Sequence, residues 1–194
     1  ETALQEESGS VLVFLPGEKE IHSLHRHLQQ KISGNHILLA PLYGRLPFAE
    51  QQAAIMPAPE GKRKIVMSTP VAETGLTIEG IRIVVDSGRR RISRLDARTG
   101  LNHLETMRIS QASARQRCGR AGRLGPGTCY RIWSEYEHVT LLPFSPPEML
   151  YSDLTALSLE LALWGAGDPS DLVWLDPPPT EEIQRARHLL YSLD

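Results

Sequence analysis

The hydrophobic pattern of this 194-residue chain alternates short apolar runs with longer amphipathic segments. A continuous apolar run at 11–15, bounded by Gly and Pro, predicts a buried strand. Residues 18–32 carry apolar side chains at helical spacing and predict a helix that ends at Gly34-Asn35. Further strands are expected over 37–39, 64–68, 81–86 and 128–133, with a short helix over 47–56. Strands that alternate with helices predict an α/β fold with a mostly parallel sheet flanked by helices.

Two segments depart from this alternation. Residues 87–109 hold two polar-apolar stretches around a turn candidate at 96–100, which predicts a β-hairpin. A proline-rich break at 143–147 predicts a domain boundary, with one domain over 1–143 and the start of another over 144–194. Helices are expected in the second part over 148–164 and 180–190.

Composition limits the classes of protein that fit. A hydrophobic fraction of 41% is enough for a real core. The chain contains no run of 18 apolar residues, so no membrane span is predicted. The cysteines, Cys118 and Cys129, form no C-x-x-C, and the scattered histidines lack matching ligands, so no metal site is expected. With no basic-plus-apolar leader, we expect a reducing, cytoplasmic location and no membrane partner.

Charge is unevenly distributed along the chain, although the net charge is only −2. Residues 82–131 carry twelve Arg and three acids, which gives +9. Residues 132–194 carry eleven acids and two Arg, which gives −9, and residues 1–81 contribute the remaining −2. A basic segment of arginines suits forked contacts to phosphate, so a nucleic acid is the expected partner. The alternative is that some of these arginines pair with the acidic segment.

The stretch 116–123, Gln-Arg-Cys-Gly-Arg-Ala-Gly-Arg, is the most informative. If a helix starts after an N-cap at Ser110 and continues, Gln116, Arg120 and Arg123 share one face about two turns long. Arg117 lies on another face and is expected to hold structure. Two guanidinium groups and an amide in a row suit a triphosphate, and the alternative is a basic face that binds solvent or RNA phosphate.

Glycines in the middle of this stretch need a reason, because Gly119 and Gly122 are poor helix formers. Close approach of another backbone or of a ligand is one such reason, since glycine has no side chain in the way.

The same stretch resembles motif VI, QRxGRAGR, of the DEAH/RHA-type superfamily 2 helicases. Residues 68–80 resemble motif V of that family, residues 11–17 resemble motif IV, and residues 41–47 resemble the segment after it. These ordered matches cover nearly the whole chain. Residues 98–101, 163–165 and 174–179 resemble the bacterial HrpB-type subfamily in particular.

The resemblance implies a fold and a role for the chain. The fold would be RecA-like, as in P-loop NTPases, with 1–143 as the second RecA-like (helicase C-terminal) domain. Residues 144–194 would begin a degenerate winged-helix domain, and the hairpin would lie against nucleic acid. Without the resemblance, an ordinary surface hairpin is the alternative.

The resemblance also assigns site residues. Arg120 and Arg123 would act as arginine fingers on the γ-phosphate of ATP, with Gln116 orienting the phosphate or the attacking water. Thr77 and Glu79 would lie near the nucleotide, with Glu79 at the ribose. The remaining assignments are Gly75 and Ile55 on the nucleotide side, and Thr69, Thr74, Arg89, Arg90 and Arg91 toward the nucleic acid.

Two elements of a complete motor are missing from the sequence. No G-x-x-x-x-G-K-[ST] and no Asp-Glu-Ala-His occur, so we expect no ATP hydrolysis by this chain alone. The first residues, 1–5, suggest entry from a preceding domain. An upstream RecA-like domain of the same protein would hold ATP and Mg²⁺, and single-stranded RNA, or alternatively DNA, would be the substrate. The competing function is a non-catalytic module that binds nucleic acid or protein.

Three positions depart from the family pattern. Pro70 replaces the usual Asn of motif V and removes a backbone donor, and Gly75 replaces Ser. Ile55 stands where many members have a Phe that stacks on the base. We therefore expect little discrimination between nucleotide bases.

Overall fold

The computed structural model describes residues 2–32, 34–96 and 98–193. This part of the chain divides into two compact units. The first contains the residues up to Arg91 together with Thr106–Ser145, and the second contains Ile92–Glu105 together with the residues from Pro146 on.

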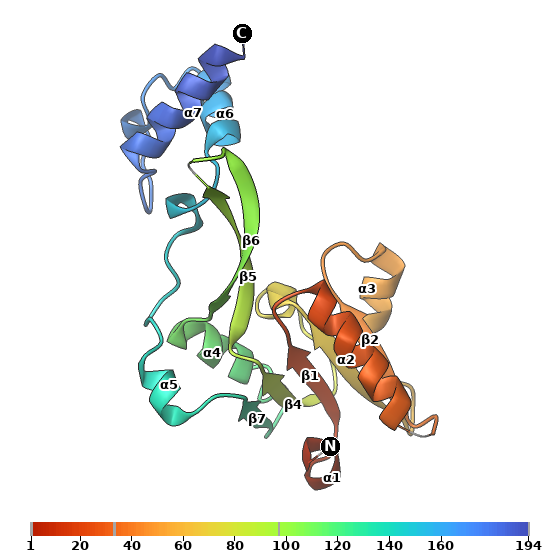
Figure 1. The fold of residues 1–194 in the computed structure, drawn as a ribbon. Helices are drawn as coiled ribbons and strands as arrows, with labels where there is room; N and C mark the ends of the chain where they lie inside the picture. Colours follow the sequence, from red (N-terminus) through yellow and green to blue (C-terminus); the bar gives the residue numbers. More distant parts are fainter. Residues whose placement is uncertain (1, 33, 97, 194) are drawn as a thin grey trace. The chain divides into compact units, whose positions relative to one another are not determined.

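The first unit is built on a five-stranded sheet in the order β2-β3-β1-β4-β7 (Figure 1). Every pairing in this sheet is parallel, which confirms the predicted α/β class. The strands are β1 (Ser10–Phe14), β2 (Ile37–Leu42), β3 (Arg63–Ser68), β4 (Ile81–Asp86) and β7 (Thr128–Arg131). The strand β2 runs three residues beyond its prediction through Pro41, which an edge strand tolerates.

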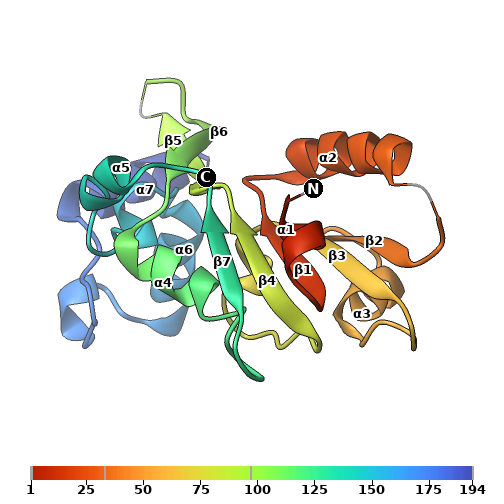
Figure 2. The ribbon, with the colours of Figure 1, turned by 90° about the horizontal axis from the view of Figure 1, so that it is seen from below.

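Helices cover both faces of this sheet because alternate strand residues point to opposite sides. Val11 and Val13 pack with α1 (Thr2–Glu6) and α2 (Glu18–Lys31) on one face. Leu12 and Phe14 pack on the other face with Ala54 of α3 (Phe48–Ile55) and with residues of the loop that follows β3. Figure 2 shows α2 and α3 on opposite sides of the strands.

Local chemistry explains where the remaining helices of the first unit begin. Ser110 caps α4 (Gln111–Cys118) by accepting a hydrogen bond from the Ser113 N–H at 3.1 Å, as predicted. Ser134 and Glu137 form a capping box that starts α5 (Glu135–Val139), a helix that the sequence analysis missed. Pro47 is the N-cap of α3 and precedes its first turn, so the predicted start at Pro47 was one residue early.

Motif VI does not continue as one helix. The predicted two-turn face through Arg123 is wrong, because α4 ends at Cys118 and turns follow. The Arg120 N–H bonds to the carbonyl of Arg117 three residues back, and the Ala121 N–H bonds to that of Cys118 in the same way. Bonds to residues three positions back, in place of four, are typical of 3₁₀ turns, so Arg120 and Arg123 do not continue the α-helical face of α4.

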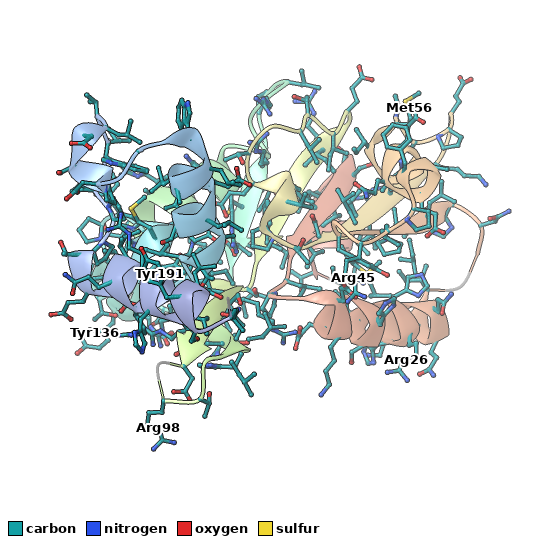
Figure 3. The ribbon with its side chains drawn as sticks, turned by 90° about the horizontal axis from the view of Figure 1, so that it is seen from above. Arg26, Arg45, Met56, Arg98, Tyr136 and Tyr191 are labelled. Carbon is teal, nitrogen blue, oxygen red and sulfur yellow. The ribbon has the colours of Figure 1, made fainter. Side chains whose placement is uncertain are left out.

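The predicted hairpin is confirmed as β5 (Arg89–Asp96) paired with β6 (Leu101–Arg108). Its turn is closed by hydrogen bonds from the Thr99 and Gly100 N–H groups to the Asp96 carbonyl. Ala97, which the predicted turn includes, lies outside the described residues. In Figure 3 Arg98 extends from the hairpin tip into the surroundings.

The second unit packs α6 (Thr155–Trp164) against α7 (Thr180–Ser192). Leu154, Ile183 and Ala186 form its small buried core. The predicted helix over 148–164 is wrong, because a short 3₁₀ turn at Glu148–Leu150 and a break precede α6. The carboxylate of Asp153 accepts hydrogen bonds from the Thr155 N–H and hydroxyl, which favours a helix start at Thr155.

A buried lysine anchors the end of α3. Lys64 in β3 is only 5% exposed, and its ammonium group donates to the carbonyls of Ala53, Ala54 and Met56. Burial lowers the pKa of Lys64. These carbonyls are at the C-terminal end of α3, where a positive charge is favourable and the carbonyls lack helical partners. The contact fixes the segment that carries Ile55.

Lys64→Met should lower the free energy of unfolding by about 2 kcal/mol, because the carbonyls at the end of α3 lose a charged donor while they stay partly buried. Urea unfolding followed by circular dichroism measures this difference. Lys19→Met on the exposed side of α2 is the control and should change stability by less than about 0.5 kcal/mol. Equal effects of the two substitutions would contradict the anchoring role.

Candidate functional site

The candidate site lies where the loop after β3 meets the end of α4. The loop, residues 69–80, begins with the 3₁₀ turn Pro70–Ala72 and carries the motif V residues. Residues 116–123 approach it from α4 and from the turns that follow. Both segments pack on the face of the sheet formed by Leu12 and Phe14, with Ala72, Ile78 and Ala121 in the same core cluster.

Arg117 is the buried centre of this arrangement. Its side chain has no exposed surface, and its guanidinium group donates to Glu73 at 2.8 Å and to Asp86 at 2.8 Å. It also donates to the carbonyl of Arg89 at 3.2 Å and lies 4.9 Å from the centre of the Phe14 ring. The expectation that Arg117 holds structure is confirmed, because it joins β1, β4, β5 and the motif V loop to α4.

The partners of Arg117 are themselves held in place. Glu73 accepts a 2.6 Å hydrogen bond from the Ser113 hydroxyl, and Asp86 accepts one from the Gly88 N–H at 2.9 Å. Burial raises the pKa of Asp86, and the charge of Arg117 and the Gly88 hydrogen bond oppose this rise. The ionised carboxylate is therefore costly in this position, and Arg117 is the group that compensates for it.

Arg120 and Arg123 meet at one backbone oxygen of the motif V loop. Arg120 donates to the Leu76 carbonyl at 2.5 Å and to the carbonyl of Glu73. Arg123 donates to the same Leu76 carbonyl at 3.0 Å. Arg120 is partly buried and Arg123 is exposed. Burial, and second the nearby charge of Arg123, lowers the pKa of Arg120.

The other residues predicted for the nucleotide lie around this point. Gln116 is exposed on the last turn of α4, and Thr77 lines a shallow hollow together with Arg120 and Arg123. Glu79 lines a neighbouring, wider hollow that also includes Pro57 and Ala58 of the segment after α3. The structure thus gathers Thr77, Arg120 and Arg123 around one hollow and Glu79 in the next, although sequence spacing gave the wrong helix.

Residues predicted to face nucleic acid are more dispersed. Thr74 is exposed in the motif V loop, and Thr69 is partly exposed at the end of β3. Arg89 at the start of β5 is exposed and Arg90 is partly buried. Arg91 forms an ion pair with Glu20 of α2 at 3.0 Å, so its guanidinium group already has an anionic partner.

The departures from the family pattern have local explanations. Pro70 occupies the first position of a 3₁₀ turn, where no backbone donor is needed. Gly75 has φ +76°, a left-handed conformation that favours glycine. Ile55 is partly buried against the core on the Leu12 face, while the adjacent Met56 is 56% exposed and points outward (Figure 3).

The glycines of motif VI are not explained by close packing within the described chain. A Cβ on Gly122 would meet nothing within 4 Å, and one on Gly119 would make ordinary contacts with carbonyls of α4. The expected approach of another backbone is therefore not seen among the described residues. The space beside Gly122 is open, so the close approach of a ligand stays a prediction.

Several arginines of the basic segment form ion pairs, and one of these pairs is with the acidic segment, the alternative that the charge distribution left open. Arg108 forms an ion pair with Glu137 of the acidic segment. Arg91, Arg94 and Arg117 pair with acids outside that segment, as far as the described ion pairs go. These pairs leave less free positive charge than the sequence total suggests.

The thiols and possible metal ligands add no chemistry to this site. Burial, and second the neighbouring Cys118, raises the pKa of the Cys129 thiol to about 12, so this thiol is a poor nucleophile. Within residues 2–32, 34–96 and 98–193, no group of three or more His, Cys, Asp or Glu side chains is placed to hold a metal ion.

No helix in this described part is long and apolar enough to cross a membrane.

Sequence reasoning missed two residues that organise the site. Glu73 was quoted within motif V without a role, yet it binds Arg117 and Ser113 through its carboxylate and Arg120 through its carbonyl. Leu76 contributes a backbone oxygen, which no side-chain pattern can reveal. The acid at position 73, next to the predicted Thr74, was the only available signal.

A parallel sheet with the motif V loop and the motif VI segment packed on one face defines the second RecA-like domain of a helicase. The family described as helicase conserved C-terminal domain matches residues 1–125, and the chain belongs to this family. The Escherichia coli K12 ATP-dependent RNA helicase HrpB is 49% identical over 190 residues, which cover 98% of this chain and 23% of that protein. The Borreliella burgdorferi ATP-dependent RNA helicase HrpA is 39% identical over 190 residues, with the same coverage.

Solved structures agree with these relatives. Two crystal structures of Escherichia coli HrpB, described as a DExH-box NTPase and as a DEAH/RHA helicase, match with TM-scores of 0.87 and 0.91. Both are 49% identical and cover 98% of this chain and 24% of their own. The resemblance to DEAH/RHA helicases is confirmed. The chain spans about a quarter of the length of the relatives named here.

Arg117→Ala should lower the free energy of unfolding by about 3–5 kcal/mol, because it leaves Asp86 and Glu73 with uncompensated charge. Guanidinium unfolding monitored by tryptophan fluorescence gives this value. Arg115→Ala is the matched control, since Arg115 lies two residues away on α4 with an exposed side chain. A loss at Arg117 no larger than the loss at Arg115 would show that the buried ion pairs do not hold the site together.

Proposed function

We propose that this chain is the C-terminal half of the motor of an ATP-dependent RNA helicase. An upstream RecA-like domain of the same protein holds ATP and Mg²⁺, and the present domain closes over it. Arg123 and Arg120 then stabilise the charge that develops on the γ-phosphate, while Gln116 orients the phosphate or the attacking water. Preorganised positive charge of this kind contributes roughly 10³–10⁵ in rate in related NTPases.

The observation that carries this proposal is the meeting of Arg120 and Arg123 beside Thr77. Two guanidinium groups share a single neutral acceptor, so they have capacity for an anion. Arg123 is exposed, as a residue that reaches across to another domain must be. The names of the relatives, which are RNA helicases, support RNA over DNA.

The guanidinium groups of this chain suit the phosphates of ATP. They are not ligands for Mg²⁺. Guanidinium groups bind phosphate oxygens in forked geometry. Glu79 lies in the same hollow as Pro57 and Ala58, and we assign this hollow to the ribose and the base. In this proposal the upstream domain and the phosphates would hold Mg²⁺, which would neutralise charge there.

The grip on RNA is proposed for Thr69, Thr74 and Arg89, which are at least partly exposed at one end of the sheet or at the base of the hairpin. Opening and closing of the two RecA-like domains would move the strand along. Contacts to phosphate and sugar carry no base information, so low sequence preference follows.

Arg123→Ala in the full-length protein should lower RNA-stimulated kcat for ATP by 10³-fold or more, because the transition state loses a positive charge. Steady-state ATPase assays with and without single-stranded RNA measure the loss, and binding of a fluorescent ATP analogue shows whether ATP is still held. Arg115→Ala on the same segment should retain turnover. Unchanged turnover in Arg123→Ala, with RNA still bound, would contradict the half-motor and favour the non-catalytic binding module.

The same protein should use ATP and GTP with kcat/KM values within about tenfold of each other. Ile55 packs on the core and offers no aromatic face to stack on a base, so one source of base discrimination is missing. Parallel steady-state assays with the two nucleotides measure this ratio. Ile55→Phe should raise kcat/KM for both, and a strong preference for ATP in the unmodified protein would contradict this account of Ile55.

A further inference from the structure

The two cysteines of this chain lie beside each other, although they belong to different elements. Cys118 is the last residue of α4, and Cys129 lies in β7, where it pairs with Val84 of β4. The Cys118 thiol and the Cys129 thiol share a side-chain hydrogen bond. Both are free thiols, and the side chain of each is partly buried.

Backbone packing brings the two segments together independently of the thiols. Gly127, two residues before Cys129, lies so close to the turns after α4 that a Cβ built on it would overlap the carbonyl of Ala121. Ala121 belongs to the core cluster on the Leu12 face of the sheet, and Cys129 packs against that cluster. The fold itself therefore places the end of α4 against β7.

The environments of the two thiols differ, and this difference sets the order in which they would react. Burial, and second the neighbouring Cys118, raises the pKa of the Cys129 thiol to about 12, so Cys129 stays protonated at neutral pH. The thiolate is the form that reacts with oxidants. The thiol that meets an oxidant first is therefore Cys118, with Cys129 held next to it as a resolving thiol.

We propose that Cys118 and Cys129 form an oxidation site at which a peroxide produces a reversible disulfide. Hydrogen peroxide transfers one oxygen to the Cys118 sulfur, which gives a sulfenic acid and one water. The Cys129 sulfur then attacks the Cys118 sulfur, an S–S bond forms, and the sulfenic hydroxyl leaves with the Cys129 proton as a second water. A small thiol reverses the reaction by thiol–disulfide exchange.

The disulfide would close a ring around the arginines of motif VI. Arg120 and Arg123 both lie between Cys118 and Cys129 in the sequence. A cross-link restricts the conformations of the segment that it encloses. The effect on turnover rests on the half-motor function proposed above, in which both arginines must reach a phosphate held by another domain. Oxidation should then inhibit the motor, whereas the disulfide itself does not depend on that function.

Peptide mapping of the full-length protein after treatment with hydrogen peroxide tests the oxidation site. Trypsin cleaves after the flanking arginines, so the disulfide should link the peptides of residues 118–120 and 124–131, and dithiothreitol should separate them. In Cys129→Ala the resolving thiol is gone, so Cys118 should stay a sulfenic acid that dimedone labels. Equal dimedone labelling of Cys118 in the unsubstituted protein, without the linked peptides, would overturn the proposal.

ATPase assays on the same samples test the effect of the ring. RNA-stimulated kcat should fall at least about tenfold on oxidation, because the enclosed arginines are assigned most of the rate enhancement, and it should return with dithiothreitol. Cys118→Ser is the control and should keep its kcat before and after peroxide. Linked peptides with an unchanged kcat, or an equal loss of kcat in Cys118→Ser, would overturn the inhibitory effect.

Arg123→Ala, run beside these variants, separates the oxidation site from the proposed function. If turnover survives in Arg123→Ala, the half-motor function fails, while the linked peptides still establish the disulfide. If turnover is lost in Arg123→Ala and no linked peptides form in the unsubstituted protein, the function stands and the oxidation site is overturned.

Discussion

The site depends on a guanidinium group that has no access to water. Arg117 compensates for a fully buried Asp86 and a mostly buried Glu73, and it stacks against Phe14. A buried charge that lost its partner would be strongly destabilising, so these residues hold each other in one geometry. Because they come from β1, β4, the motif V loop and α4, a single set of contacts joins the segments that carry motif V and motif VI.

The other two arginines of this segment have more weakly bound partners than Arg117. Arg117 binds carboxylates inside the domain, whereas Arg120 and Arg123 bind neutral backbone oxygens at its surface. An ion pair in a dry interior resists exchange, but a hydrogen bond to a carbonyl is readily exchanged for a stronger one to phosphate. Three arginines of one short segment thus divide into one that binds buried carboxylates and two that bind backbone carbonyls.

Ion pairs in the structure neutralise part of the positive charge that the sequence concentrates in residues 82–131. The +9 of residues 82–131 suggests a broad basic surface. In the structure, Arg91, Arg94, Arg108 and Arg117 have acidic partners, so these four arginines are not part of an unpaired basic surface. Family membership and the crystal structures of HrpB agree with a helicase domain.

The sequence by itself determined the α/β class, the strands β1, β3 and β4 almost to the residue, the hairpin, and the motifs that identify the family. Apolar runs and turn residues act locally, so they can be read in order along the chain. Tertiary structure decided which arginine is buried and that the Leu76 carbonyl accepts both Arg120 and Arg123. These features depend on contacts between residues more than thirty positions apart and on backbone oxygens that every residue has, and no local pattern specifies either.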